Sequence, residues 1–408
     1  MSPVRSASGF AAVAFAFAVV MAGTTIPTPL YALYSAELGF TVFTLTIVFS
    51  AYAIGVIAAL IAFGRWSDVV GRRPLLLAGV ALSAVSAVVF LTAGPVSQLI
   101  VGRVLSGLSA GIYVGTATAA IIELAPESWK HRAPAVATAA NIGGLGVGPL
   151  VTGFLAEYGP SPLHTPFVLN LAVLIVAGIG IWFIPEPVAV RSGRLSIQPL
   201  SLPREVRGVF TRAAIGAAAG FAVMGSFTSV SPSFVSKILG FDNHALAGCV
   251  VATLLAFSTI SQLAARRVPT QPAMIIGCAL LVLGTTVLIG ALTTRSLSLM
   301  LVGAATVGVG QGLSFSKGLA ALVEVCPADR RAEVTSAYFV VAFLAISFPV
   351  VGQGFAAATW GLYAGGLILD IAAAALSLLA LVSTVIASRR RHESEPGGAH
   401  DPRVPAAD

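Results

Sequence analysis

The stretch Gly64-Arg65-Trp66-Ser67-Asp68-Val69-Val70-Gly71-Arg72-Arg73-Pro74 concentrates charge between two apolar runs that are each long enough to cross a bilayer. Glycines let the chain reverse at a membrane surface and let helices pack closely. The arginines are expected on the cytoplasmic side, where positive loops are retained. Asp68 can pair with an arginine or lie at a helix N-terminus, where the dipole stabilises an anion. The stretch therefore predicts a cytoplasmic loop between two membrane-spanning helices.

The composition indicates an integral membrane protein. Of 408 residues, 57% are hydrophobic and 10% are charged, whereas a soluble domain carries about 25% charged residues. The formal net charge is +7, but the basic residues lie between apolar spans, so a lipid bilayer rather than a nucleic acid is the predicted partner. Cys249, Cys278 and Cys326 lack metal-ligand or redox spacing, and we predict no metal site and no cofactor.

The chain contains twelve apolar spans near the roughly 20 residues that a membrane helix needs. They do not alternate in the way that barrel strands do, so we predict an all-α integral membrane fold. Each span is given by its approximate bounds: Gly9–Leu33, Val42–Phe63, Leu75–Leu91, Gln98–Leu124, Ala133–Ala156, Pro166–Ile184, Ala213–Val235, Ala245–Ala264, Ala273–Leu292, Leu297–Val323, Ala332–Ala357 and Gly361–Ala387. The predicted domains are an N-terminal six-helix bundle over 1–186, a cytoplasmic linker over 187–212, a C-terminal six-helix bundle over 213–388 and a disordered cytoplasmic tail over 389–408.

Basic residues fix the predicted orientation. Most of the 23 Lys and Arg residues fall in segments expected at the cytoplasmic face, and the exceptions are Arg103, Lys237, Arg295 and Lys317. By the positive-inside rule both termini are therefore predicted to be cytoplasmic, in a multi-pass protein of the plasma membrane.

An internal repeat predicts two pseudo-symmetric halves. The run Leu38-Gly39-Phe40 recurs as Leu239-Gly240-Phe241, and at the same separation Gly107 matches Gly308 and Glu123 matches Glu324. The charged loop lacks a counterpart in the second half, because Asp68 corresponds to a proline there. A one-sided role for the loop is therefore predicted.

The charged loop resembles the signature between helices 2 and 3 of the major facilitator superfamily, G-x-x-x-D-x-x-G-R-R/K. The matching residues are Gly64, Asp68, Gly71, Arg72 and Arg73. The resemblance implies two six-helix bundles that rock about a central cavity, with this loop as part of the gate. We expect Asp68 to pair with Arg72 or to face the N-terminus of helix 11. We expect Glu123, at the inner end of helix 4, to lie close to Arg72 or Arg73.

Helix 4 carries a charge within the apolar span. Arg103, Gly107 and Gly111 are similar to the family element R-x-x-x-G-x-x-x-G. A charge in hydrocarbon is costly and is expected to face the bundle interior, while glycines four apart let a neighbouring helix approach. Arg103 therefore has two interpretations, a coupling or binding residue and a packing residue bonded to backbone carbonyls.

Helix 5 contains Gly144-Leu145-Gly146-Val147-Gly148-Pro149-Leu150-Val151-Thr152-Gly153. This run resembles the family element G-x-x-x-G-P-x-x-G-G, which implies an exporter that exchanges solute for protons, with Thr152 as a departure. Pro149 removes a backbone donor and bends the helix. Gly144, Gly148 and Gly153 are expected to form a smooth face for the opposite half; the alternative is a generic kinked, glycine-rich helix.

In the family, helices 1, 4, 7 and 10 line the central cavity, and the resemblance implies a surface rich in hydroxyl and aromatic groups. The candidate cavity residues are Thr28, Tyr31, Tyr34, Tyr113, Phe227, Gln311 and Phe315, with Asn141 from helix 5. Such a surface suits amphipathic organic molecules, although these side chains often bond neighbouring helices instead.

The candidate proton carrier is Asp370, the acidic residue placed deepest in a span. The expected alternative is a buried structural aspartate. Helix 1 has no acidic residue before Glu37, and the spans contain no histidine.

The sequence thus predicts a monomeric secondary transporter, not an enzyme, that exports a small-molecule solute (a drug or natural product) with the proton gradient as driving force. The alternatives are uptake or facilitated diffusion of a small metabolite such as a sugar or carboxylate, and a non-transporting receptor or scaffold.

Overall fold

The computed structural model describes residues 3–64, 66–187, 197, 200–327 and 330–394. Twelve of its helical spans are long and apolar enough to cross a membrane, which confirms the predicted all-α membrane fold. The helices of the first half are α1 (Pro3–Thr25), α2 (Pro27–Leu38), α3 (Val42–Phe63), α4 (Trp66–Val69), α5 (Arg72–Leu91), α6 (Val96–Leu124), α7 (Ala133–Thr138), α8 (Gly144–Tyr158) and α9 (Thr165–Trp182). Those of the second half are α10 (Arg204–Ser229), α11 (Ser231–Lys237), α12 (His244–Ala264), α13 (Thr270–Thr294), α14 (Leu297–Val325), α15 (Arg331–Trp360) and α16 (Leu362–Ser394).

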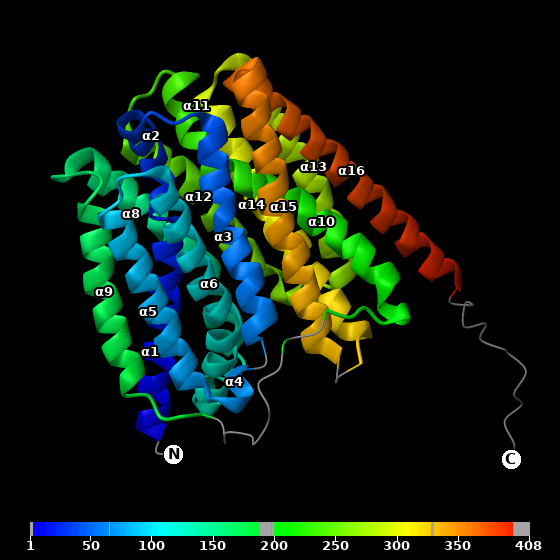
Figure 1. The fold of residues 1–408 in the computed structure, drawn as a ribbon. Helices are drawn as coiled ribbons and strands as arrows, with labels where there is room; N and C mark the ends of the chain where they lie inside the picture. The colour runs from blue at the N-terminus through cyan, green and yellow to red at the C-terminus, as the bar shows by residue number, and fades with distance from the viewer. Residues whose placement is uncertain (1–2, 65, 188–196, 198–199, 328–329, 395–408) are drawn as a thin grey trace, which may run out of the picture.

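The two halves form two bundles that lie side by side (Figure 1). Helix α3 packs on α15 and helix α8 packs on α12, and these two pairs make most of the contact between the bundles. We call the end that carries α4 the linker end, and the end that carries α2 and α11 the far end. In Figure 1 the bundles meet at the far end and diverge toward the linker end.

Two spans are interrupted at points where a proline lies in the first turn of the next helix. The first span divides at Ile26, where Pro27 begins α2. The seventh divides at Val230, and Pro232 lies in the first turn of α11. Proline cannot donate a backbone hydrogen bond and restricts the residue before it, so the regular helix stops at these points.

The fifth span combines a π-helical turn with an internal proline. Residues Ala139–Gly143 form the π-turn between α7 and α8. Within α8, Pro149 cannot donate to the carbonyl of Leu145. The Thr25 hydroxyl of α1 donates to that carbonyl instead, at 2.9 Å. A neighbouring helix thus satisfies the polar group that proline frees, as a bilayer interior requires.

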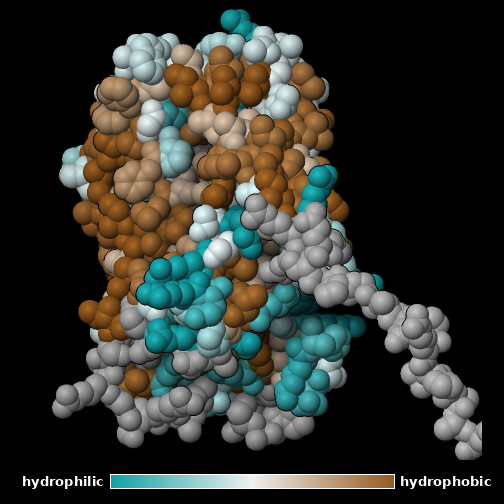
Figure 2. Space-filling model, turned by 90° about the vertical axis from the view of Figure 1, so that its right-hand side faces the viewer, coloured by the Kyte–Doolittle hydropathy of each residue, from teal (hydrophilic) through white to brown (hydrophobic). Residues whose placement is uncertain are grey.

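Large apolar side chains cover the outside of the bundles. Phe15, Ile54, Phe154 and Ile175 are each roughly half exposed or more, and Figure 2 shows apolar atoms over much of one face, with hydrophilic atoms gathered toward the linker end. Lipid tails solvate such a surface, since they are as apolar as the side chains themselves.

The predicted linker is shorter than expected. Helix α10 begins at Arg204, inside the range 187–212 predicted as linker. Val206 and Phe210 are buried while Arg207 is exposed, so an amphipathic turn extends the helix beyond its apolar span. The rest of that prediction falls largely on residues 188–196 and 198–199, outside the described residues. Helix α16 continues to Ser394, so the tail predicted from residue 389 begins as helix, and its remainder, 395–408, also lies outside them.

Candidate functional site

A cavity of about 60 Å³ lies between the two bundles. Both halves line it, with Thr28 from α2, Asn141 from the π-turn and Phe315 from α14 among the predicted cavity residues. Its remaining walls are mostly apolar and aromatic: Met21, Phe49, Tyr52, Val114, Ile142, Leu145, Phe221, Met224, Leu255, Phe339, Phe343 and Ile346, with the hydroxyls of Thr24, Thr25 and Thr228. We call this space the central cavity.

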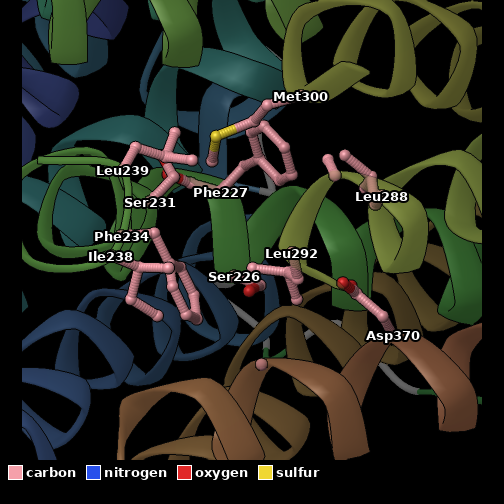
Figure 3. Close-up of a pocket in the computed structure, with 12 residues that line it drawn as sticks. Ser226, Phe227, Ser231, Phe234, Ile238, Leu239, Leu288, Leu292, Met300 and Asp370 are labelled. Atoms are coloured by element: carbon pink, nitrogen blue, oxygen red, sulfur yellow. The ribbon is translucent and has the colours of Figure 1, made fainter. Parts of the chain in front are cut away.

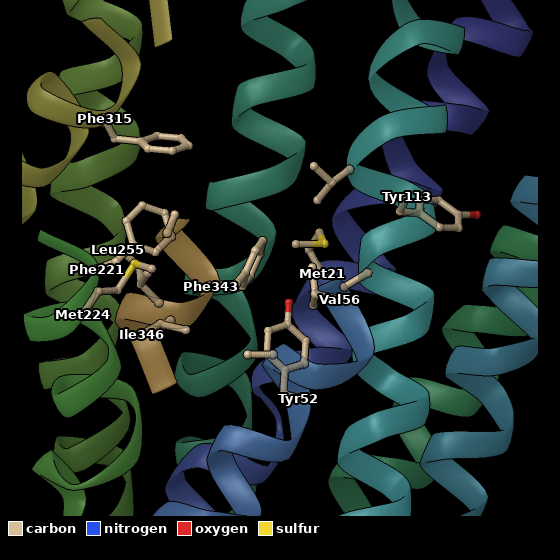
Figure 4. Packing of buried hydrophobic residues seen from close by; sticks show 14 of the residues in the cluster. Met21, Tyr52, Val56, Tyr113, Phe221, Met224, Leu255, Phe315, Phe343 and Ile346 are labelled. Carbon is tan, nitrogen blue, oxygen red and sulfur yellow. The ribbon is translucent and has the colours of Figure 1, made fainter. Parts of the chain in front are cut away.

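Aromatic rings from opposite halves meet in the central cavity. Tyr52 of α3 and Phe343 of α15 have ring centroids 6.2 Å apart in an edge-to-face arrangement, and Phe221 of α10 lies 6.4 Å from Phe343. Figure 4 shows Tyr52 and Phe343 directed toward the same space between the bundles. Edge-to-face pairs at this separation are attractive, so the rings hold the halves together at this level.

Arg103 is the charged residue of the central cavity. Its side chain is 2% exposed, and its guanidinium donates to the carbonyl of Thr24 at 2.5 Å and of Phe49 at 3.5 Å. The charge lies over the Tyr52 ring, 4.6 Å from the centroid. Among the described residues, Nε has no hydrogen-bond partner and no acidic side chain lines the cavity. The cation thus retains one donor without a partner, in a side chain that lines the central cavity.

The other predicted cavity residues lie elsewhere, which corrects that part of the prediction. Tyr34 donates to the Phe90 carbonyl at 3.2 Å, and Gln311 accepts from Ser258 at 2.5 Å. Tyr113 packs against Phe17 with centroids 6.0 Å apart and points away from Tyr52 in Figure 4. Each hydroxyl or amide sits on a helix face that packs against its own half.

Tyr31 and Phe227, which were also predicted to line the central cavity, lie outside it. Tyr31 is buried and does not line the central cavity. Phe227 lines a second cavity beside Asp370, within the C-terminal half. The sequence reasoning did not identify the aromatic residues of the second and eleventh spans, which are α3 and α15, among them Tyr52 and Phe343. The four-residue spacing of Phe339 and Phe343, which places both on one face of α15, was an available signal.

The glycine element of the fifth span, Gly144–Gly153 in α8, packs against two different neighbouring helices. A Cβ at Gly144 would lie 2.6 Å from the Ala18 carbonyl, and one at Gly148 would meet the Thr25 hydroxyl. Both glycines therefore face α1, within their own half, and not the opposite half as predicted. A Cβ at Gly153 would lie 2.7 Å from the His244 carbonyl of α12. Gly146 also faces α12, since a Cβ there would lie 3.3 Å from Leu255, so the element contacts both α1 and the second bundle.

The contact of α8 with α12 forms a seam at the far end. A Cβ at Gly248 of α12 would lie 2.4 Å from the carbonyl oxygen of Pro149, and the backbone N–H of His244 donates to Glu157 at 2.8 Å. Across the other contact, Ser50 of α3 donates to the Ser347 carbonyl of α15 at 3.3 Å. These contacts close the far end over the central cavity.

The charged loop folds on its own half. Arg72 pairs with Asp68 at 2.8 Å and with Glu123 at 2.9 Å, and a second guanidinium nitrogen donates to Glu123 at 3.2 Å. Ser67 also contacts the guanidinium. This geometry confirms the predicted Asp68–Arg72 and Glu123–Arg72 proximities. Bidentate charge-assisted bonds of this type are strong and directional.

Glu186, after α9, is a residue of this site that the sequence reasoning did not identify. Its carboxylate accepts the backbone N–H groups of Arg72 at 2.6 Å and Arg73 at 3.0 Å. Gly71 has a positive φ of 103°, and a Cβ there would lie 2.7 Å from the Glu186 carboxylate. Glu186 therefore caps α5 and ties the start of the linker to the charged loop, where the helix dipole favours an anion.

We expect Glu186→Gln to lower the free energy of unfolding by about 1 kcal/mol, a usual value for a lost cap. An amide has one acceptor oxygen and no charge, so it cannot hold both N–H groups. Thermal unfolding of the purified protein in detergent measures the change. The matched control is Glu127→Gln, since Glu127 pairs with Lys130 on an exposed surface. Equal melting temperatures for both variants would contradict the capping role.

Comparisons with known proteins agree with this architecture. The family model described as the Major Facilitator Superfamily matches residues 13–350. An uncharacterised MFS-type transporter of Mycobacterium tuberculosis is 30% identical over 191 residues, which is 46% of this chain and 27% of that protein. Multidrug resistance protein 2 of Bacillus subtilis is 27% identical over 135 residues, 33% of each chain. The present chain thus covers only about a third or less of these relatives' length.

The fold also matches a solved structure along its full length. A bacterial homologue of the human lysosomal transporter Spinster, in an inward-facing and unoccupied conformation, superposes with a TM-score of 0.74. It shares 14% sequence identity, and the match covers 96% of this chain and 98% of that chain. Twelve spans in two bundles, the charged loop with its partners and the match over residues 13–350 place this chain in the major facilitator superfamily.

Proposed function

We propose that the protein exports small amphipathic organic molecules by alternating access, driven by an inward proton gradient. As a member of the superfamily it is a multi-pass membrane transporter of small-molecule solutes and not an enzyme. The observation that carries the proposal is the central cavity, which both halves build and which the far-end seam closes. A binding space between two bundles that separate at one end is what alternating access requires.

The orientation follows from charge. The linker end holds Arg72, Arg73, Lys130 and Arg132, so we place it in the cytoplasm by the positive-inside rule. The cavity is then closed toward the outside, and a solute would bind from the cytoplasm. The glycine element Gly144–Gly153 in α8 resembles one that implies exchange of solute for protons. This resemblance supports export as the direction of transport.

The residues that line the central cavity favour a particular class of solute. Aromatic and aliphatic walls favour an apolar body, while Arg103 offers a fixed positive charge with a free donor. A lipophilic cation would meet this charge in a low-dielectric space without an acidic partner, which is unfavourable. We therefore propose that the solute carries an anionic or strongly accepting group beside Arg103.

Uptake of a small carboxylate is the second candidate, because Arg103 could bind one. A small polar solute, however, would leave the rings of Tyr52, Phe221 and Phe343 without an apolar partner. An amphipathic solute satisfies the rings and the guanidinium together, which favours the export of larger amphipathic molecules.

The test is dye accumulation in a pump-deficient bacterial host that expresses the protein. Fluorescein and a rhodamine ester share a xanthene body but differ in charge, so they form a matched pair. We expect cells with the protein to retain less fluorescein than vector controls, with a smaller effect on the rhodamine ester. Increased fluorescein retention would indicate uptake, and preferential loss of the rhodamine ester would contradict the proposed charge preference.

A further inference from the structure

A second cavity of about 20 Å³ lies within the C-terminal half, apart from the central cavity. Helix α16 contributes Asp370, which projects toward it from one side, and helix α10 contributes Ser226 and Phe227 (Figure 3). The cavity lies near the far end, because Leu239 follows α11 and Leu292 and Met300 flank the α13–α14 turn. We call it the Asp370 cavity.

Asp370 and Ser226 have no hydrogen-bond or ion-pair partner among the described residues. Asp370 is 7% exposed and Ser226 is 6% exposed. A buried carboxylate without a counter-charge is expensive in apolar surroundings, whereas a neutral acid requires only a hydrogen-bond partner. A space of this size holds one water molecule when polar groups are present to bind it. The arrangement therefore favours a proton on Asp370, with a water in the cavity, which Ser226 can also bind, as its partner.

Among the described residues, no other titratable side chain lines the Asp370 cavity. The helices packed around it carry charged or titratable groups that lie outside its lining: Arg204, Glu205, Arg207 and Arg212 on α10, Lys237 on α11, Cys278 on α13 with Arg295 at its end, Lys317 and Glu324 on α14, Arg331, Glu333 and Tyr338 on α15, and Tyr363 and Arg389 on α16. Asp370 is thus the group that can bind a proton in this space.

Helix α10 separates the two cavities. Phe221, Met224 and Thr228 line the central cavity from one face of the helix, and Ser226 and Phe227 line the Asp370 cavity from the other. The helix ends at Ser229, and Val230 joins it to α11. A change in the packing of α16 on α10 would therefore reach both the central cavity and this break.

We propose that the Asp370 cavity is a proton-binding site that acts on helix α10, an inference that rests on the proposed proton-driven export. A hydronium ion at the far end transfers the proton: one of its O–H bonds breaks, which leaves water, and a new O–H bond forms to a carboxylate oxygen of Asp370. The neutral acid lets α16 pack closely on α10. Release of the proton leaves an anion that draws water into the cavity and loosens α16 from α10 at the break.

Infrared difference spectroscopy tests protonation without any solute. The purified, reconstituted protein is compared between acidic and alkaline pH, and the carbonyl-stretch band of a protonated carboxylic acid is followed. We expect a band that is lost in Asp370→Asn and shifted in Ser226→Ala. Ser377→Ala is the control, because Ser377 is buried on the same helix and bonds to its own backbone at 2.7 Å. A wild-type spectrum identical to that of Asp370→Asn would overturn the proposal, as would a band that responds to Na⁺ at fixed pH.

Transport by proteoliposomes tests the coupling, with fluorescein as the probe. We expect Asp370→Asn to lose at least tenfold of the pH-driven flux while it retains solute exchange at equal pH, and Asp370→Glu to restore part of the driven flux. Full pH-driven flux in Asp370→Asn would overturn the coupling role. If the wild type shows no pH-driven flux, the proposed driving force fails, and the infrared band still decides whether Asp370 binds a proton.

Discussion

Arg103→Ala is expected to reduce transport per molecule by at least about thirtyfold, the equivalent of roughly 2 kcal/mol for a truncated buried charge. The guanidinium bridges the Thr24 and Phe49 carbonyls and lies over Tyr52. Its removal takes away the cation of the central cavity and the hydrogen bonds that it donates to those carbonyls. The loss is measured as initial flux of fluorescein in proteoliposomes that contain equal amounts of protein.

Arg103→Lys separates charge from geometry. A lysine keeps the charge but lacks the planar fork that reaches two carbonyls and stacks on a ring, so we expect only partial recovery of flux. Arg132→Ala is the control, because Arg132 also lies over an aromatic ring, Trp129, but on the surface. Normal flux per molecule in Arg103→Ala, with only reduced expression, would support the packing interpretation instead.

Gly248→Ala is expected to hold the protein open at the far end and to lower transport. The added Cβ would lie 2.4 Å from the Pro149 carbonyl, and this backbone oxygen cannot rotate away. Overpacking of this kind costs about 1–3 kcal/mol, which shifts an equilibrium between two states by about 5- to 150-fold. The added Cβ destabilises only the state in which the seam is closed, because the state with separated bundles does not bring α8 and α12 together.

Thiol labelling reports the shift at the seam. Thr46 is fully buried at the far end, where it packs against Gly354. In a cysteine-free background, Thr46→Cys should react slowly with a membrane-impermeant maleimide and faster when Gly248→Ala is added. Gly352→Ala is the matched control, since a Cβ at Gly352 meets nothing within 4 Å. Equal labelling rates in all three proteins would show that α8–α12 contact does not govern closure.

Much of the fold could be predicted from the sequence because membrane helices must satisfy their own backbone. Long apolar runs located the spans, and the charged loop predicted the Asp68–Arg72 pair. The linker was misjudged because the first turns of α10 are charged, and an apolar window does not detect an amphipathic extension. Pro232 was the available signal for the break before α11.

The cavity could be predicted only in part, because a sequence does not reveal which face of each helix turns inward. Thr28, Asn141 and Phe315 line the central cavity, whereas Tyr34 and Gln311 bond to neighbouring helices. The rings of Tyr52 and Phe343 were missed because the second and eleventh spans, which carry them, were not among the spans expected to line the cavity. Glu186 was missed because its partners are backbone N–H groups far away in sequence.

Proteoliposomes with an imposed pH step test proton-driven alternating access most directly. In the proposed orientation, with the linker end in the cytoplasm, each proton that enters supplies about 2.3 kcal/mol per 100 mV of membrane potential. We expect fluorescein to move against the direction of proton entry, at a rate that rises with the pH step and the potential and falls in Arg103→Ala and Gly248→Ala. Fluorescein movement that is indifferent to both the pH step and the potential would contradict proton-driven export.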